Sequence, residues 1–297
     1  MATAAQGAAG TIYDIGYQHY DGPRLGRPYA IRSLLLHGIG VVFGVGRGPR
    51  ARLVPIVLTI IAILPAVIQA AVTAYAGEAV QLVGYADYFV QLSVIYVLFC
   101  AAQAPELVSA DQRSRSLVLY LARALRRDDY VLAKLFALAV GVFALALGAQ
   151  LVLFTGRVLG SLNAWEALRY EAPQLAPIFG VSALVSLVLA SLSVAIASLT
   201  PRRALATAGI VGFFILSSAM AGILREAIEG AWDRWLTLLN PFIAVGGVSN
   251  WIFEAEPGPN SPLARLDLPG WAYAGACLTY MALAMGILWV RYRRIDA

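Results

Sequence analysis

Six runs of about 20 predominantly apolar residues dominate this sequence, and each is long enough to cross the hydrocarbon core of a membrane as a helix. The predicted spans cover residues 53–75, 86–105, 132–155, 174–199, 204–224 and 271–290. The second run, ADYFVQLSVIYVLFCAAQA, is the most polar of the six. These runs predict an all-α polytopic membrane protein whose transmembrane domain occupies residues 53–297.

The composition supports a membrane setting over a large water-soluble core. Of the 297 residues, 60% are hydrophobic and 13% are charged, whereas soluble domains are about 45–50% apolar and about 25% charged. The formal charge of +5 would suit a nucleic acid. However, the basic residues cluster at the ends of the apolar runs, so we expect membrane lipid and no nucleic acid as a partner.

The distribution of basic residues predicts the orientation of the chain. If the N-terminus is cytoplasmic, 17 of the 22 basic residues fall in cytoplasmic segments and five fall outside. Basic residues favour the cytoplasmic side of a membrane. We therefore predict six spans with both the N- and C-termini in the cytoplasm.

Two segments outside the spans have a character of their own. Residues 1–52 form a predicted cytoplasmic N-terminal segment without a cleavable signal. Within it, PYAIRSLLLHGIGVVFGVGRGPR is too short to span and predicts an amphipathic helix lying in the membrane interface. Residues 225–270 predict an external cap of short helices, with Trp232, Trp235 and Trp251 at the outer interface.

Several kinds of chemistry are missing from the sequence. It contains no GxxxxGK[ST] phosphate-binding loop, no HExxH and no GxSxG motif. The two histidines, His19 and His37, are too few for a convincing metal site, and Cys100 and Cys277 form no CxxC group. We therefore expect no catalytic residue, metal ligand or cofactor in this chain.

The stretch between spans 2 and 3 is amphipathic. In ELVSADQRSRSLVLYLARALRRDDYVLAKLFAL, helical spacing places Leu117, Leu121 and Leu125 on one stripe. A neighbouring polar stripe carries Arg113, Ser116, Tyr120, Arg123 and Arg127. The segment can be read either as a solvated loop that anchors the spans by its charge or as a helix, over about residues 109–125, that offers a surface to a partner protein.

These features together resemble the permeases of the ATP-binding-cassette type-2 exporter family. The residues that match the family pattern after span 2 are Asp111, Arg113, Leu117, Leu121, the run ARAL at 122–125, Arg127, Asp129, Tyr130, Lys134 and Leu135. Two positions depart from it, because Ala124 replaces the usual proline and Ala133 the usual glycine. The segments LLNPFIAVGGVSNWIF and YDIGYQHYDGPRLGRPYAI also resemble, respectively, the external element of the family and the N-terminus of its actinobacterial-type members.

The resemblance implies that two permeases pair, as a homodimer or with a sister subunit, and that separate ATPase subunits bind on the cytoplasmic side. ATP and Mg would then lie on the partner chains. The segment at about 109–125 would be the coupling helix, and its ATPase-docking residues would be Asp111, Arg113, Leu117, Tyr120, Leu121, Arg123, Leu125 and Arg127. The resemblance further implies a substrate path between the paired permeases, along spans 2 and 5. For this path we predict Gln91, Tyr96, Phe99, Phe213 and Phe214.

Two other classes of function compete with an exporter subunit in a bacterial plasma membrane. A secondary transporter or channel usually carries buried carboxylates or broken helices near the middle of the membrane, and the predicted spans show neither. A membrane-embedded lipid enzyme or assembly factor would need a cluster of His, Asp or Glu, for which Glu226, Glu229 and Asp233 are the candidates. The apolar spans favour an amphipathic or hydrophobic exported compound, such as a drug, antibiotic or lipid.

Overall fold

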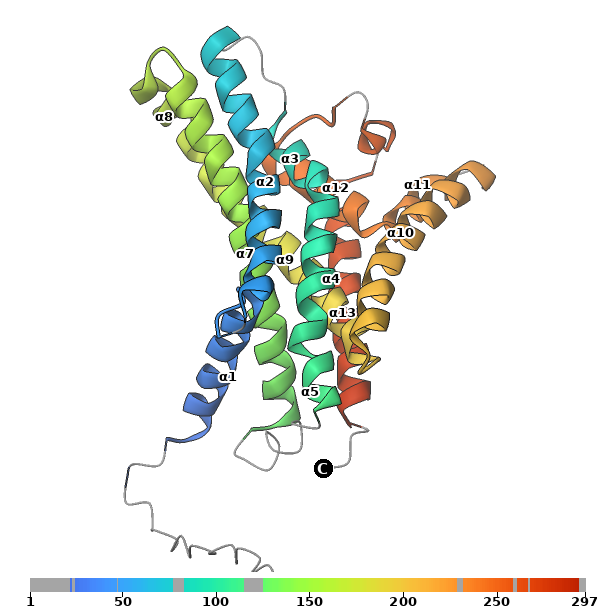
Figure 1. Ribbon diagram of the computed structural model, residues 1–297. Coiled ribbons are helices and arrows are strands. Elements are labelled where there is room, and N and C mark those ends of the chain that lie inside the picture. The colour runs from blue at the N-terminus through green and yellow to red at the C-terminus, as the bar shows by residue number, and fades with distance from the viewer. Residues whose placement is uncertain are drawn as a thin grey trace, which may run out of the picture.

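The part of the chain that the computed structural model describes consists of helices and their connections, without strands. The described residues are 22, 25–46, 48–76, 83–114, 125–228, 232–258, 261–266 and 268–293. The α-helices are α1 (Arg27–Val42), α2 (Pro49–Ala76), α3 (Tyr85–Gln91), α4 (Ser93–Leu107), α5 (Ser109–Arg113), α7 (Arg127–Gly160), α8 (Ala164–Glu171), α9 (Leu175–Ser198), α10 (Arg203–Ala227), α11 (Asp233–Leu236), α12 (Pro241–Phe253) and α13 (Gly270–Arg293). Short 3₁₀ turns lie at η1 (Ala172–Gln174), η2 (Thr237–Leu239) and η3 (Pro262–Arg265). Figure 1 shows the long helices gathered into one bundle.

Six helical segments are long and apolar enough to cross a membrane, which agrees with the predicted number. They are Arg52–Val72, Ser93–Arg113, Arg127–Gly160, Ala164–Ser198, Arg203–Ala227 and Gly270–Arg293. The third is longer than predicted, because α7 continues for 34 residues. The fourth begins earlier than predicted, because α8 and η1 lead directly into α9.

The predicted second span is divided into two helices. At Leu92 the backbone leaves helical geometry, with φ −80° and ψ 2°, and this residue separates α3 from α4. Continuity is largely kept, since the Leu92 N–H donates to the Tyr88 carbonyl and the Tyr96 N–H donates to the Leu92 carbonyl. α3 is a separate helix of about two turns that leads into α4.

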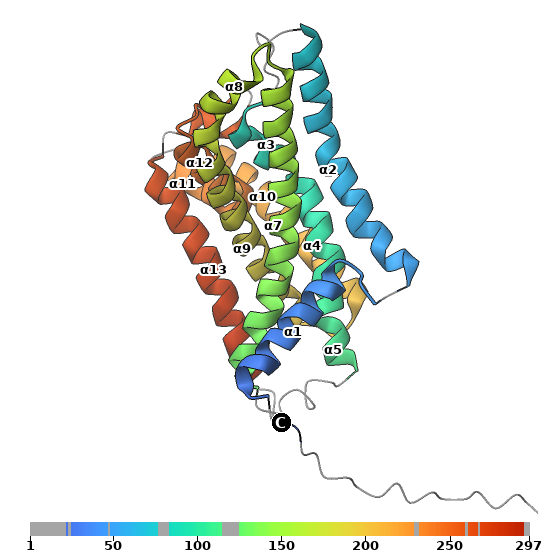
Figure 2. The same cartoon turned by 90° about the vertical axis from the view of Figure 1, so that its left-hand side faces the viewer.

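The helix predicted to lie in the membrane interface is α1, which packs along one side of α7 (Figure 2). Small residues allow this contact. A Cβ atom on Gly38 would lie 2.7 Å from the Ala137 Cβ, and one on Gly141 would lie 2.4 Å from Val42 Cγ1. Close approach through small residues is a common way for membrane helices to associate. The buried side of α1 consequently faces the bundle.

Within the segment predicted to form an external cap, α12 packs into the bundle rather than on its surface. α12 meets the segment Asp233–Leu239 at 105° and packs against α3, α9 and α13. A Cβ atom on Gly247 would lie 2.3 Å from the Tyr273 ring, and one on Gly246 would lie 2.8 Å from Val90. These two glycines allow the backbone of α12 to approach its neighbours, which a surface cap would not require.

Three contacts define one end of the bundle, which we call the basic end. There the start of α1 meets the start of α7 through Arg27 and Asp129. In the same region Arg127 meets Arg293 at the end of α13, and Tyr130 meets Asp111 of α5. The first and last described helices thus begin and end, respectively, on the same side of the bundle (Figure 1).

Candidate functional site

The segment that leads out of span 2 ends in α5, at the basic end. α4 and α5 are separated only by Val108, and α5 ends at Arg113. From this point the described chain resumes at Leu125, directly before α7. The contacts of α5 therefore determine how the predicted coupling segment is fastened to the bundle.

A buried ion pair fastens α5 to α7. Lys134 Nζ lies 2.7 Å from Asp111 Oδ2, and the Lys134 side chain is only 3% exposed. The Tyr130 hydroxyl donates to the same carboxylate oxygen at 2.9 Å. The Tyr130 ring also packs against the Tyr292 ring of α13, with centroids 5.6 Å apart. One carboxylate of α5 is thus held by two side chains of α7, one of which contacts α13.

The carbonyl end of α9 forms a second attachment for α5. The Ser109 hydroxyl donates to the Ala197 carbonyl at 3.1 Å, and Gln112 Nε2 donates to the Ser198 carbonyl at 2.9 Å. Arg291 Nε of α13 donates to that same Ser198 carbonyl at 3.3 Å. The last carbonyls of a helix lack partners within the helix. Here side chains of α5 and α13 donate hydrogen bonds to them.

Two further ion pairs tie the neighbouring helices to this end. Arg27 binds both carboxylate oxygens of Asp129, at 2.8 and 2.7 Å, and joins α1 to α7. Its hydrogen bond to Asp129 raises the pKa of the Arg27 guanidinium above its ordinary value. Arg203 of α10 pairs with Glu106 of α4. A displacement of α5 would therefore act on α4, α7, α9 and α13. In addition, α1 is attached to α7, and α10 is attached to α4.

Four of the eight predicted docking residues lie among the described residues. Arg113 is exposed, whereas the Asp111 carboxylate is turned inward to Lys134. Leu125 is 7% exposed. Arg127 is half-buried and donates to the Arg293 carbonyl at 3.0 Å. The other four, Leu117, Tyr120, Leu121 and Arg123, lie outside the described residues.

The predicted path residues do not share one surface. Gln91 is exposed and continues a stripe with Val94 and Leu98 of α4, which are also exposed. Tyr96 and Phe99 are each 1% exposed and lie on the buried side of α4.

The two predicted path residues of α10 lie beside α12. Phe214 is buried between Phe213 and Phe242 of α12, with ring centroids 5.4 and 5.3 Å away. Phe213 is half-buried. Of the five residues predicted for the path, only Gln91 is therefore exposed on the single chain.

Sequence reasoning missed a polar cluster at the opposite end of the bundle. Tyr85 donates its hydroxyl proton to Glu171 Oε2 at 2.9 Å, and Arg157 Nη1 lies 3.8 Å from Glu171 Oε1. Arg157 Nη2 and Gln69 Nε2 both donate to the Val83 carbonyl, at 2.6 and 3.0 Å. The cluster fixes the start of α3 to α2, α7 and α8. Nothing in the local pattern predicts it, because Arg157 and Glu171 each read as the charged end of an apolar run.

The described residues hold no group of three or more His, Cys, Asp or Glu side chains arranged for a metal ion. Cys100 and Cys277 are both buried free thiols.

Comparison with known proteins agrees with the resemblance noted in the sequence. Residues 29–297 match the family described as "ABC-2 family transporter protein". No curated protein matches the chain. Since the match covers nearly the whole chain, including all six apolar helices and the network at the basic end, the protein is a member of the ABC-2 family of transporters.

Proposed function

We propose that this chain is the permease subunit of an ATP-driven exporter, which moves an amphipathic or hydrophobic compound outward across a bacterial plasma membrane. Membership of the ABC-2 family and six apolar helices make it a multi-pass membrane transport protein. The observation that carries the finer proposal is the attachment of α5, through Asp111, Ser109 and Gln112, to α7 and α9. A helix so fastened can transmit force, which is what a coupling element requires.

In this proposal the energy for transport comes from ATP that is bound by other chains. Separate ATPase subunits bind ATP and Mg and dock on residues 109–125. Leu117 and Leu121 bury against the partner, while Arg113, Arg123 and Arg127 meet its acidic groups and contribute steering more than net affinity. Closure of the ATPase pair then displaces α5, and the buried contacts pass this displacement to α4 and α7. This is rigid-body motion about an interface, a common form of conformational switching.

The basic end is the cytoplasmic end in this proposal. It carries Arg27, Arg113, Arg127, Arg203 and Arg293, in keeping with the preference of basic residues for the cytoplasmic side. Both termini are then cytoplasmic, and the α11–α12 segment lies toward the outside.

A second permease copy, or a sister subunit, would cover apolar surface that one chain leaves exposed. α4 and α10 pack side by side. Both expose large apolar side chains, which are Val94, Leu98, Ile215, Leu216, Met220 and Ile223. Pairing across this face would place the exposed stripe of Gln91, Val94 and Leu98 at the substrate path between the two subunits.

The buried carboxylates do not argue for a secondary transporter. Glu171 and Asp129 are buried and pair with Arg157 and Arg27, while the half-buried Asp111 pairs with Lys134. They belong to opposite ends of the bundle rather than to one shared site. A coupled transporter would instead bring its ion and substrate groups together near the middle of the membrane.

Copurification tests the proposal directly. The permease is expressed together with the proteins encoded beside its gene and isolated in mild detergent, and we expect a nucleotide-binding subunit to come with it. Leu117→Asp with Leu121→Asp should abolish this association while the permease still inserts, because two carboxylates cannot be buried in an apolar contact without a large cost. The matched control is Leu159→Asp with Leu162→Asp. It adds the same charges to exposed positions at the opposite end and should leave the association intact. A permease that binds no ATPase, or a Leu117/Leu121 variant that still binds it, contradicts the proposal.

A further inference from the structure

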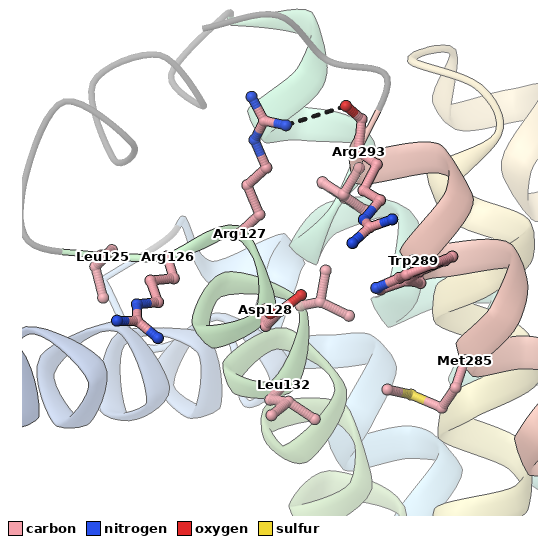
Figure 3. A pocket seen from close by; sticks show the side chains of 10 residues that line it. Leu125, Arg126, Arg127, Asp128, Leu132, Met285, Trp289 and Arg293 are labelled. Atoms are coloured by element: carbon pink, nitrogen blue, oxygen red, sulfur yellow. Dashed lines mark hydrogen bonds between the residues drawn. The ribbon is translucent and has the colours of Figure 1, made fainter.

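A cleft opens at the basic end between the start of α7 and the end of α13. Its volume is about 660 Å³. The lining residues are Leu125, Arg126, Arg127, Asp128, Val131, Leu132, Met285, Trp289, Tyr292 and Arg293. Figure 3 shows Leu125 and Arg126 on one side of it, Met285, Trp289 and Arg293 on the other, and Asp128 and Leu132 of α7 between them.

The mouth of the cleft carries an excess of positive charge. It holds the guanidinium groups of Arg126, Arg127 and Arg293, against the single carboxylate of Asp128. None of these three arginines takes part in an ion pair with another described residue. Arg127 donates one hydrogen bond to the Arg293 carbonyl, at 3.0 Å. Among the described residues that line the cleft, three guanidinium groups thus outnumber one carboxylate.

The walls below this mouth are apolar. Val131 and Leu132 come from α7, and Met285 and Trp289 come from α13. Leu132 and Trp289 are exposed, at 40% and 51%, and they continue into the apolar surfaces of two candidate membrane spans. The Arg293 guanidinium lies 3.8 Å from the centroid of the Trp289 ring. Tryptophan is enriched at the level of lipid headgroups, so this pair suits the boundary between headgroups and acyl chains.

We propose that this cleft binds an anionic phospholipid of the cytoplasmic leaflet. Arg126 and Arg293 bind the phosphate and the negative headgroup, and the first part of an acyl chain lies along Leu132, Met285 and Trp289. Basic pockets between membrane helices on the cytoplasmic side are suited to such headgroups. Guanidinium groups also match phosphate oxygens with paired hydrogen bonds. The apolar walls favour a lipid over a soluble anion. The proposal rests on the orientation in the proposed function, since anionic lipid is concentrated on the cytoplasmic side.

The site has a further consequence for coupling. Arg126 and Arg127 connect the predicted coupling segment to α7, and Asp129, two residues on, accepts from the Arg126 N–H at 3.0 Å. A lipid bound here would therefore contact the point where the predicted coupling segment joins α7.

Native mass spectrometry of the purified permease, without any ATPase, tests the site. The protein in detergent is titrated with phosphatidylglycerol or with phosphatidylcholine of the same acyl chains. We expect preferential retention of phosphatidylglycerol, with affinity falling roughly 5-fold for each arginine removed by Arg126→Ala and Arg293→Ala. Arg126→Lys with Arg293→Lys keeps the charge and should retain most of the binding.

Arg169→Ala is the matched control. Arg169 is also an exposed arginine over a tryptophan, 5.1 Å from the Trp165 ring, but it belongs to the opposite end. Its removal should leave retention unchanged. Equal retention of both lipids, or full retention by the double alanine variant, overturns the proposal. Displacement of phosphatidylglycerol by an equal concentration of inorganic phosphate also overturns it, because the site would then select a small anion. Since no ATPase is present, these results are independent of whether the permease docks one.

Discussion

At the scale of single residues, Lys134 has the most consequential position at the basic end. It is the only lysine of the chain, and its ammonium lies between Asp111 and the Tyr130 ring, 5.4 Å from the ring centroid. Desolvation of two charges offsets most of their attraction, so a buried ion pair is weak support for net stability. What such a pair does enforce is geometry, because neither charge is tolerated alone. Here the enforced geometry is the position of α5 against α7.

Removing one member of this pair should therefore be costly. We predict that Lys134→Met lowers the free energy of unfolding by about 3 kcal/mol, the lower end of the range for breaking a buried pair, because Asp111 keeps some contact with water. Unfolding in mixed micelles of mild detergent and SDS measures the loss. Adding Asp111→Asn to Lys134→Met should recover part of it, since no charge then stays buried without a partner. Additive losses in the double variant would show that the two side chains are not coupled.

At the scale of elements, α7 is the helix on which the rest of the bundle is assembled. It is the longest helix, and it carries contacts to α1, α2, α8 and α9 along its length. Two of its glycines, Gly141 and Gly156, are placed where neighbours approach closely. A Cβ atom on Gly156 would lie only 2.5 Å from the Ala70 Cβ of α2. In lipid, where apolar side chains gain little by leaving the solvent, such close backbone packing is a main source of helix association.

Gly156 and Gly148 of α7 have different surroundings, so substituting each of them tests the contribution of close packing. Gly156→Ala should cost roughly 1–3 kcal/mol, the usual penalty of overpacking, because the atom it meets belongs to Ala70 and cannot rotate away. Gly148→Ala is the control, since a Cβ atom there meets nothing within 4 Å. Unfolding midpoints of the two variants in the same detergent make the comparison. A loss of stability from Gly148→Ala as large as that from Gly156→Ala would locate the effect in α7 itself rather than in its contact with α2.

The helices also show which structural features can be predicted from hydrophobic periodicity and length, and which cannot. Runs of about 20 apolar residues predict membrane spans, and six helices of that length and composition are present. A helix of 13 mostly apolar residues such as α12 fits equally well at an interface or inside a bundle. Gly246 and Gly247 decide between these, but only because Val90 and Tyr273 lie opposite them. Likewise, the sequence motif contains Asp111, yet its inward orientation depends on Lys134 lying 23 residues further along the chain.

At the scale of the whole molecule, charge and apolar surface are divided in an orderly way. The ends of α1, α5, α7 and α13 bring arginines together at the basic end, while α2, α10 and α13 expose apolar side chains between the ends. This division is what a bilayer would select. The two native cysteines are buried, so an introduced cysteine can report on one end at a time.

Labelling with a membrane-impermeant maleimide tests the orientation. Leu162→Cys, at a fully exposed position of the opposite end, should be labelled in intact cells. Ser114→Cys, exposed at the basic end, should be labelled only after the membrane is opened. The unmodified chain serves as the background control. The reverse pattern would place the basic end outside and would contradict both the proposed orientation and the proposed source of the bound lipid.

The all-helical class, the six long apolar helices and the family could all be predicted from the sequence alone. This is because these features depend on local composition and spacing, and because a bilayer allows few alternatives to a long apolar helix. Other features required the folded structure: α12 is buried, Asp111 points to Lys134, and Arg157, Glu171 and Tyr85 meet. So did the cleft in which Arg126, Arg127 and Arg293 come together. Each of these joins residues far apart in the chain. Such contacts depend on which helices become neighbours and on how closely their backbones approach. Neither can be predicted from any single segment of the chain.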